Sequence, residues 1–500
     1  MTVTGTGAYG RALDALTARG PGRMVPDLTR ITELTSLLGD PQRAYRSVHV
    51  TGTNGKGSTV RITSALLEAI GLRTGTYVSP HLQDVRERIM VGLRPISPEV
   101  FAEVHAEVDA LARLMDDRAV EQHGDDAHPV TFFELMTAMA FAHLADEAVD
   151  VGVIEVGLGG RWDATNVMDA DVAVIGEVDL DHSMLGDTPE QVAGEKVGII
   201  KPGSHVVSAA QTPGVTAIVD RAAADVDAIP VVVGRDLMLV GREAIAGGQR
   251  VTVDVRGRRI DDLLLPLRGE HQARNLLLAL GAVEGLLGPS FAAVDDDVLR
   301  AGVAAVRVPG RLEVVREDPT VVVDAAHNPH AARALATALG ESFRFRDVIL
   351  VIGCLDDKDV EGIVGALGAV ASHVVVTAPP SERAASMDRM LAAAEAVFGP
   401  RGVHVEVAED VAHALDLAMS ITGPADAVVV TGSITTVGAA REHLQPAEVM
   451  RAEAAGETDS GLRTLLVGLD GEIEDDVDGD AAGDADGDVA GDDDEQPGLD

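Results

Sequence analysis

Two alternating patterns of hydrophobic positions run along this chain. Between residues 47 and 308, stretches with apolar residues at helical spacing separate short β-branched and apolar runs at 47–50, 149–156, 172–175 and 205–207. Apolar runs of this length are typical of buried parallel strands, and the stretches between them fit crossover helices. The pattern predicts an α/β domain with a mainly parallel sheet over residues 47–308.

A second series of strands begins after Pro309-Gly310, which we interpret as a linker. Five apolar runs, each followed by an Ala- and Leu-rich amphipathic stretch, lie at 321–324, 348–352, 374–377, 403–407 and 427–431. This spacing predicts a smaller, Rossmann-like α/β domain over residues 309–445. Residues 1–46 are expected to form helices and loops.

Residues 446–500 differ in composition from the rest. From Asp470 onward the chain carries 15 acidic and no basic residues, with Gly and Ala between them. Such a segment cannot bury enough apolar surface to fold, so the sequence predicts a disordered acidic tail.

Charge and composition exclude several classes of function and partner. The chain has 500 residues and a formal net charge of −41, which argues against binding to nucleic acid or to an anionic membrane surface. A single cysteine excludes an intrachain disulfide framework, and no signal peptide is expected at the start. We therefore expect a cytoplasmic protein whose partners are small molecules.

The strongest chemical motif lies where the first predicted strand ends. The segment GTNGKGS (52–58) joins that strand to an amphipathic helix at 60–70. A glycine-rich turn before a helix presents backbone N–H groups to phosphates, and Lys56 adds a positive charge. Only four of the 40 cationic residues are lysine, so a lysine at this position is notable. We interpret the turn as a nucleoside triphosphate site, with a structural glycine turn as the alternative.

Further polar residues follow strands of the same domain. Glu155 lies at the carboxyl end of the run at 149–156, and a carboxylate beside a triphosphate commonly binds Mg²⁺. His182 follows a strand and could ligate a metal as a neutral imidazole, although a lone histidine is more often a core or capping residue. Lys196 lies in the next helix, where a surface ion pair with Glu195 is the simpler interpretation.

The second domain carries a comparable motif. Asp324 ends its first strand, where a carboxylate suits the hydroxyl groups of a ribose. His327, Asn328 and Pro329 come next. A plain helix start also explains this triplet, because Asn is a favoured N-cap and Pro a favoured first helical residue.

Taken in order, these motifs resemble those of the folylpolyglutamate synthase/dihydrofolate synthase family, a branch of the Mur ligase-like enzymes. The resemblance runs from about Pro41 to Gly438 and rests on HVTGTNGKGST, YVSPHL, TFFE, EVGLGGRWDATN, LDH with LGDT, EKVGIIKPG, GEHQARN, PGR, DAAHNP, DKD and TGS. Any one of these is weak, whereas eleven in order are not a coincidence. The resemblance implies a Mur ligase-like ATP-binding domain over 47–308 and a glutamate ligase domain over 309–445.

The resemblance also implies a role for each matched position on the nucleotide side. The residues expected to bind ATP are Asn54, Gly55, Lys56, Gly57, Ser58, Asn275, Arg311 and Asp324. Magnesium, as two ions, would be ligated by Ser79, Glu155 and His182. Lys196 matches a position that is carbamylated in the family, a modification open to a primary amine and closed to a guanidinium. Catalysis is thereby assigned to Lys196, Lys56 and His182.

The remaining matched positions concern the other two substrates. The residues that match the pterin-side segments are Thr131, Phe132, Phe133, Glu134, Trp162, Asp163 and Ala164, and those that match the glutamate side are His327 and Ser433. The implied reaction phosphorylates a carboxylate of dihydropteroate or a reduced folate with ATP. The amine of L-glutamate then attacks the acyl phosphate, which yields an amide, ADP and phosphate. A monomer is expected.

Two departures from the family pattern lie beside the implied metal ligands. The segment between His182 and Gly186 is one residue shorter than usual, and Val197 follows Lys196 where the family usually has alanine. They motivate an alternative, a nucleotide-binding protein without catalysis. A Mur-type ligase of different specificity and a phosphate-loop kinase are further alternatives, and a kinase would release ADP without glutamate.

Overall fold

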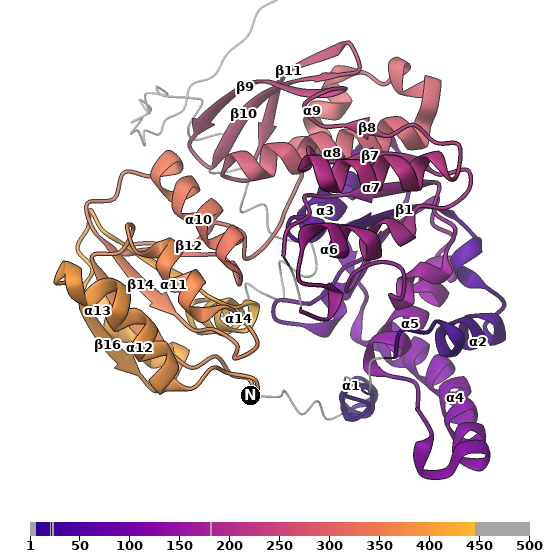
Figure 1. Cartoon of the computed structure of the whole chain (residues 1–500), viewed down its shortest axis with the longest axis horizontal. Helices are drawn as coiled ribbons and strands as arrows, with labels where there is room; N and C mark the ends of the chain where they lie inside the picture. Colours follow the sequence, from indigo (N-terminus) through magenta and orange to yellow (C-terminus); the bar gives the residue numbers. More distant parts are fainter. Residues whose placement is uncertain (1–6, 21, 23–24, 181–182, 446–500) are drawn as a thin grey trace, which may run out of the picture.

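The computed structural model describes residues 7–20, 22, 25–180 and 183–445, which form two α/β domains (Figure 1). The larger sheet has the strand order β4-β3-β2-β5-β1-β6-β7-β8. Its strands are β1 (Arg46–Thr51), β2 (Thr74–Tyr77), β3 (Ile89–Val91), β4 (Arg94–Pro95), β5 (Val151–Glu155), β6 (Val172–Ile175), β7 (His205–Ser208) and β8 (Val231–Val232). The neighbouring strands from β2 to β8 pair in parallel, whereas β3 at one edge pairs antiparallel with both β2 and β4.

Helices cover both faces of this sheet, as its almost wholly buried central strands require. One face carries α3 (Lys56–Ile70), α8 (Glu270–Leu287) and α9 (Asp296–Ala304). The other carries α5 (Phe132–Asp146), α6 (Pro189–Lys196) and α7 (Pro213–Ala224), with α1 (Ala8–Ala18), α2 (Thr29–Leu37) and α4 (Pro98–His123) packed around α5.

One helix in the described part of the chain is long and apolar enough to cross a membrane. It is α8 with the turn that follows it, Glu270–Ala293. In this fold α8 packs against α3 and β7 and contributes a row of leucines to the core. Its apolar character is explained by that burial.

An antiparallel sheet of three strands, in the order β11-β10-β9, was not expected from the hydrophobic pattern. It consists of β9 (Leu237–Ile245), β10 (Gly248–Val255) and β11 (Arg258–Leu265). The alternation of buried and half-buried residues along β10 shows that one face covers the core around α8 while the other faces outward.

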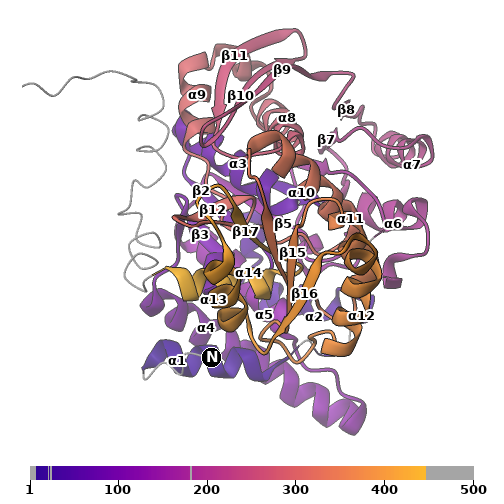
Figure 2. The same cartoon turned by 90° about the vertical axis from the view of Figure 1, so that its left-hand side faces the viewer.

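The second domain contains a six-stranded sheet with the order β12-β13-β17-β14-β15-β16, seen from its own side in Figure 2. The strands are β12 (Glu313–Glu317), β13 (Thr320–Val323), β14 (Val348–Ile352), β15 (His373–Thr377), β16 (His404–Ala408) and β17 (Ala427–Thr431). One face is covered by α10 (Pro329–Ser342), α11 (Val360–Leu367) and α12 (Met387–Phe398), the other by α13 (Val411–Ile421) and α14 (Ile434–Leu444). The five predicted strands are confirmed, and β12 joins them as an antiparallel edge strand.

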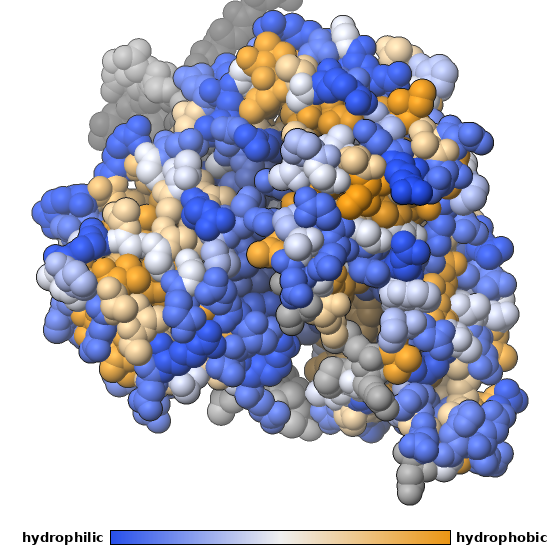
Figure 3. All heavy atoms as spheres, viewed as in Figure 1, coloured by the Kyte–Doolittle hydropathy of each residue, from blue (hydrophilic) through white to orange (hydrophobic). Residues whose placement is uncertain are grey.

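The two domains meet beside the end of β1. The side-chain Nδ2 of Asn328 donates to Oδ1 of Asn54 over 2.9 Å, and Nη1 of Arg441 donates to Oε1 of Gln83 over 2.9 Å. Figure 3 shows the surface hollowed between the two lobes, with mainly hydrophilic residues along the hollow. A polar interdomain cleft therefore lies where parallel strands of both sheets end.

Candidate functional site

The turn after β1 has the geometry of a phosphate-binding loop. Gly55 caps α3 with a φ of 81°, in the left-handed region that glycine adopts most readily. A Cβ at Gly55 would lie 2.5 Å from Oδ1 of Asn275, so any other residue there would push the Asn275 side chain of α8 away from the loop. The loop thus delivers the N-terminus of α3, with its unpaired N–H groups, to the cleft.

Glu155 lies directly beneath this helix start. It ends β5 and is 4% exposed, and its Oε2 accepts the backbone N–H of Ser79 over 3.0 Å. A Cβ at Gly57 would lie 3.3 Å from the same oxygen. Burial raises the pKa of Glu155, and the positive charge of Lys56 opposes that rise. A buried carboxylate with the hydroxyl-bearing Ser79 beside it matches the oxygen-donor preference of Mg²⁺.

Two lysines from different parts of the chain converge on one carbonyl oxygen. Nζ of Lys56 donates to the carbonyl oxygen of Gly52 over 3.0 Å, and Nζ of Lys196 donates to the same oxygen over 2.9 Å. Lys196 ends α6 and is fully buried. The interpretation of Lys196 as half of a surface ion pair is therefore wrong: a buried amine is held against the phosphate loop.

The second domain contributes a buried carboxylate from the facing edge. Asp324 follows β13 and accepts the backbone N–H groups of Leu312 and Ala326, each over 2.9 Å. Burial raises the pKa of Asp324, and the positive charge of Arg311 in the adjoining turn opposes that rise. Through its bond to Leu312, Asp324 fixes the turn that carries Arg311. The same carboxylate lies at the side of the smaller domain that faces the cleft.

His327 and Ser433 follow neighbouring strands of the smaller sheet. Nδ1 of His327 lies 2.9 Å from the carbonyl oxygen of Ala325, which can only accept, so Nδ1 carries the proton and Nε2 offers a lone pair. Burial lowers the pKa of His327 to about 4, which keeps the ring neutral. Ser433 is 1% exposed and its Oγ caps α14 by accepting the N–H of Thr436, so its hydroxyl already has a structural partner.

The segment from Thr131 to Glu134 starts α5 with a capping box. Oγ1 of Thr131 accepts the N–H of Glu134, and Oε2 of Glu134 accepts the N–H of Thr131 over 2.9 Å. Arg30 of α2 adds an ion pair to Glu134 at 3.0 Å. Two phenylalanines lie between Thr131 and Glu134. The guanidinium of Arg88 lies over the ring of Phe132, and the ring of Phe133 occupies the space that a side chain at Gly157 would need.

Trp162 stands at the mouth of an open hollow of about 630 Å³. The indole is 48% exposed, and the other lining residues are Asp27, Leu28, Thr29, Thr32, Glu33, Ser36 and Leu37, all from α2 or the residues before it. Its neighbour Asp163 is buried and accepts the N–H groups of Leu158 and Thr165, while Ala164 begins a short 3₁₀ turn. The loop from Glu155 to Ala164 thus connects the buried carboxylate to an aromatic hollow.

Comparison with known proteins decides the family. The family profile described as "Mur ligase, glutamate ligase domain" matches residues 310–434. The dihydrofolate synthase/folylpolyglutamate synthase of Mycobacterium tuberculosis is 43% identical over 440 residues, which cover 84% of this chain and 90% of that protein. This chain belongs to the dihydrofolate synthase/folylpolyglutamate synthase family.

Solved structures of this family share the fold. The structure of Mycobacterium tuberculosis folylpolyglutamate synthase complexed with ADP superposes on this chain with a TM-score of 0.82 at 41% sequence identity. The superposition covers 88% of this chain and 98% of that one. An FPGS-AMPPCP-folate complex superposes with a TM-score of 0.75 at 33% identity and covers 88% of this chain and 100% of its own. The folylpolyglutamate synthase of Lacticaseibacillus casei is 36% identical over 77% of this chain and 87% of its own. The predicted two-domain α/β fold is therefore confirmed.

The structure brings most of the predicted site residues of this family member to the cleft edge. The phosphate loop, Ser79, Glu155 and Lys196 lie together in the larger domain, and the contact of Gly55 with Asn275 adds α8. His182 lies outside the described residues. Sequence reasoning missed Glu177 and His330, which form an interdomain ion pair at 3.4 Å, and it missed the α2 residues of the hollow. The second histidine of the DAAHNPH segment was the available signal for His330.

Replacing Gly55 with alanine is expected to weaken ATP binding at least about tenfold, because the Cβ would displace Asn275 from the phosphate loop. Gly71→Ala is the matched control, since Gly71 also has a positive φ at a cap of α3 but nothing lies within 4 Å of a Cβ there. Both variants should lose about 1–2 kcal/mol of stability from backbone strain. Equal ATP affinities in a binding titration of the two variants would contradict the proposed contact.

The pair of His330 and Glu177 predicts a pH-dependent interdomain contact. Its hydrogen bond to Glu177 raises the pKa of His330 above the ordinary 6.5, and the same bond lowers the pKa of Glu177. The contribution of His330 is therefore complete below pH 6.5 and is lost as the pH rises through its raised pKa. The contribution of Glu177 is complete above its ordinary pKa of 4.5 and is lost as the pH falls through its lowered pKa.

An NMR titration of the histidine ring protons checks this assignment. His330 should titrate above 6.5, and Glu177→Gln should return its pKa toward that value. Because both side chains are partly exposed, the pair should contribute less than about 1 kcal/mol. A His330 titration that does not respond to Glu177→Gln would rule out the pair.

Proposed function

We propose that this protein is an ATP-dependent ligase that joins a carboxylate of dihydropteroate or a reduced folate to the amine of L-glutamate. The observation that carries the proposal is the contact between the phosphate loop and the start of α10, in which Nδ2 of Asn328 donates to Oδ1 of Asn54 over 2.9 Å. It joins a nucleotide-type loop of one domain to the glutamate ligase-type domain of the other. The relatives named for these activities support the same conclusion.

ATP would be held by the loop residues Asn54 to Ser58, by Asn275 and, from the second domain, by Arg311 and Asp324. The start of α3 supplies N–H groups for the phosphates. The ammonium group of Lys56, which donates to the carbonyl oxygens of Gly52 and Thr53, can turn to a phosphate oxygen instead. Burial raises the pKa of both Glu155 and Asp324, and the charged group of Arg311 lies close enough to oppose that rise at each carboxyl. This position suits it to neutralise charge at the γ-phosphate.

Magnesium fits the oxygen donors of Glu155 and Ser79, and we propose two ions with His182 as a further ligand. When bound, the metal supplies charge neutralisation for the transferring phosphoryl group. Burial raises the pKa of Glu155, and the charges of Lys56, Arg311 and Arg61 and the N–H of Ser79 oppose that rise, so they favour the ionised form that a metal ligand needs.

Lys196 is proposed to act as a carbamate. Its neutral amine attacks CO₂, a C–N bond forms, and the nitrogen loses a proton, so a buried cation becomes an anion. In the carboxylate form the group would neutralise part of the positive charge beside the phosphate loop. The full burial of Lys196 and its position 2.9 Å from the carbonyl oxygen of Gly52 support this role.

Glutamate would enter from the side of the smaller domain. The neutral ring of His327 presents Nε2 as an acceptor, which suits it to bind the amine and to keep a lone pair available for attack on the acyl phosphate. Ser433, at the start of α14, is proposed as a second contact through its backbone or hydroxyl.

The pterin end would lie between the start of α5 and the loop that carries Trp162. Trp162 lines the hollow together with α2, and Glu134 at the start of α5 is tied to α2 by its ion pair with Arg30. The half-exposed indole offers a flat face for a pterin ring. The net charge of −41 supports small-molecule partners over nucleic acid or membrane, and we propose a cytoplasmic monomer.

An assay with the full-length chain tests the function. ATP, Mg²⁺ and L-glutamate are offered with either dihydropteroate or tetrahydrofolate, and the products are identified by mass. We expect an added glutamyl residue on at least one acceptor and ADP release that requires glutamate. ADP release without glutamate would favour a kinase, and nucleotide binding with no amide from either acceptor would favour a protein without this ligase activity.

A further inference from the structure

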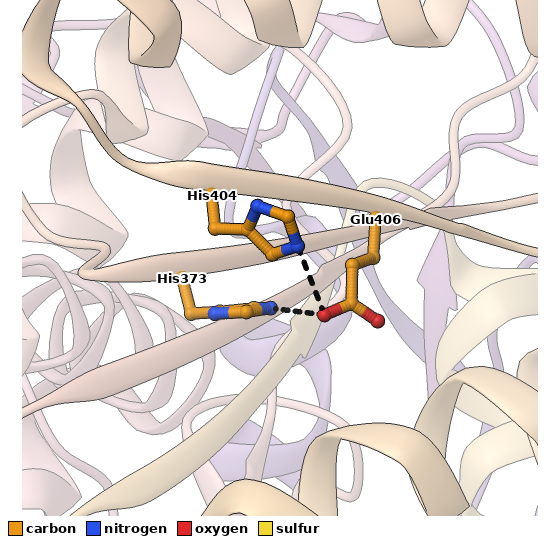
Figure 4. A group of neighbouring side chains, drawn as sticks. All are labelled: His373, His404 and Glu406. Atoms are coloured by element: carbon orange, nitrogen blue, oxygen red, sulfur yellow. Dashed lines mark hydrogen bonds and ion pairs between the residues drawn. The ribbon is translucent and has the colours of Figure 1, made fainter.

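A cluster of two imidazoles and a carboxylate lies on the outer strands of the smaller domain, apart from the cleft. It consists of His373 at the start of β15, His404 at the start of β16 and Glu406 two residues later. One ligand atom from each residue lies within 4.8 Å of the others. The three side chains come from neighbouring strands and converge on one point (Figure 4).

The strand register places these residues together. His373 pairs with His404 in the parallel ladder, so their side chains leave the same face of the sheet. Glu406 follows His404 by two positions and therefore shares that face. Val375 and Ala408, further along the same strands, pack on the side that α13 covers, so the cluster lies at the edge of that covered face. Backbone pairing thus fixes all three side chains before any ligand binds.

The atomic geometry fits a metal ion of borderline softness. Nε2 of His373 and Nε2 of His404 lie 3.1 Å and 3.3 Å from Oε1 of Glu406, and the two rings meet at 64° with centroids 5.1 Å apart. Ligands at about 2.0–2.1 Å from a tetrahedral Zn²⁺ are separated by about 3.3 Å. Two imidazole nitrogens and one carboxylate oxygen are ligands for Zn²⁺ or Co²⁺ and a poor set for Mg²⁺.

We propose that His373, His404 and Glu406 form a binding site for a divalent transition-metal ion of the Zn²⁺ class, which clamps the edge strand β16 to β15. The fourth position faces outward, because His404 is 68% exposed while His373 and Glu406 are 19% and 28% exposed. A water completes the tetrahedron there. The chain's net charge of −41 favours the capture of a cation at such a site.

The position of this site separates it from the ligase reaction. His373 and His404 begin their strands, whereas Asp324, His327 and Ser433 follow the ends of theirs. In a parallel sheet these are opposite edges. The metal therefore stabilises the edge of the domain and takes no part in phosphoryl or amide transfer.

Zinc binding to the untagged full-length chain tests the proposal, with millimolar Mg²⁺ present to occupy the proposed magnesium site. The variants are His404→Ala and Glu406→Gln, and the matched control is His443→Ala. His443 also pairs with a carboxylate, since its Nε2 lies 2.9 Å from Oδ1 of Asp416. Among the residues that the structure describes, no second imidazole joins that pair to form a metal-binding group. Isothermal titration with Zn²⁺ and the visible spectrum of bound Co²⁺ are the readouts.

Wild type and His443→Ala should each bind one Zn²⁺ in this competition and show the intense visible bands of tetrahedral Co²⁺. His404→Ala and Glu406→Gln should weaken that Zn²⁺ at least about tenfold and lose the bands, since each removes one of three ligands. Zn²⁺ should raise the Tm of wild type and leave that of the two variants unchanged. Zinc binding that is equal in all four proteins, or absent from wild type, overturns the proposal.

Two further measurements separate this site from folding and from the ligase. Without Zn²⁺ the melting temperatures of the four proteins should agree within a few degrees, because His404 is mainly exposed. Turnover with ATP and Mg²⁺ should stay within about twofold of wild type, since surface changes remote from the cleft alter little. A large loss of turnover in His404→Ala would contradict the separation of the metal from catalysis.

Discussion

Replacing Lys196 with arginine should lower kcat/KM at least about 10³-fold, equivalent to about 4 kcal/mol of transition-state stabilisation. Arginine keeps the positive charge but cannot form a carbamate, and the buried amine lies against the carbonyl oxygen of Gly52 in the phosphate loop. The measurement is steady-state ADP release with glutamate and a folate acceptor. A fully active Lys196→Arg enzyme would rule out the carbamate.

Lys201→Arg is the matched control for this change. Lys201 lies five residues further on, is half-buried and donates from Nζ to the carbonyl oxygen of Asn166 over 3.3 Å, away from the phosphate loop. Its variant should keep activity within about twofold. The larger arginine could also disturb packing around α6, so circular dichroism and ATP affinity of both variants are compared with those of wild type.

A second readout distinguishes a missing carboxylate from a damaged fold. Lys196→Ala removes the side chain from a fully buried position and leaves a space beside the loop. If a carbamate normally fills that space, added acetate should restore part of the activity to Lys196→Ala and none to wild type or Lys201→Arg. A purely structural lysine would leave Lys196→Ala insensitive to acetate.

Replacing Lys56 with methionine should lower kcat about 10³-fold. Lys56 is the one charged residue of the phosphate loop, and its loss would remove a positive charge that stabilises the phosphoryl group in the transition state. A second effect follows from the electrostatic influence of Lys56 on Glu155. Lys56 opposes the rise in pKa that burial imposes on Glu155, so its loss should raise the pKa of that carboxyl further. The acid limb of the pH–rate profile should therefore move to higher pH in Lys56→Met.

Lys56→Arg separates these two effects. It keeps a cation beside Glu155, so the acid limb should stay close to that of wild type while kcat still falls, since a guanidinium cannot replace a compact ammonium at a phosphate. The pH dependence of kcat for the three proteins is the measurement. An identical acid limb in Lys56→Met and wild type would show that Lys56 does not act on Glu155.

The sequence predicted the local parts of the site well because those parts depend on neighbouring residues. A strand, a glycine-rich turn and a helix over residues 60–70 follow from one short segment, and the structure has them as β1, Gly55 and α3, which begins already at Lys56. Asn328 and Pro329 likewise occupy the N-cap and first helical position of α10, as their side-chain chemistry favours. The apolar runs located β6 and β14 to the residue.

Long-range contacts could not be predicted in the same way. The antiparallel sheet β9–β11 depends on which face lies over α8, and its half-polar strands give a weaker pattern than buried parallel ones. The α2 side chains that line the hollow beside Trp162 lie more than a hundred residues from it in sequence. No local spacing encodes such a distance, because only the packing of α2 against α5 brings them together.

The sequence by itself determined the two-domain α/β fold, the phosphate loop and the positions of Glu155 and Asp324 at strand ends, since strand periodicity and turn chemistry are local properties. The tertiary structure alone decided that Lys196 is buried rather than paired at the surface, that it shares the oxygen of Gly52 with Lys56, and that Asn275 closes against Gly55. It also brought His373, His404 and Glu406 together. These contacts join segments that are distant in sequence, and they exist only where sheet register and helix packing bring those segments into one place.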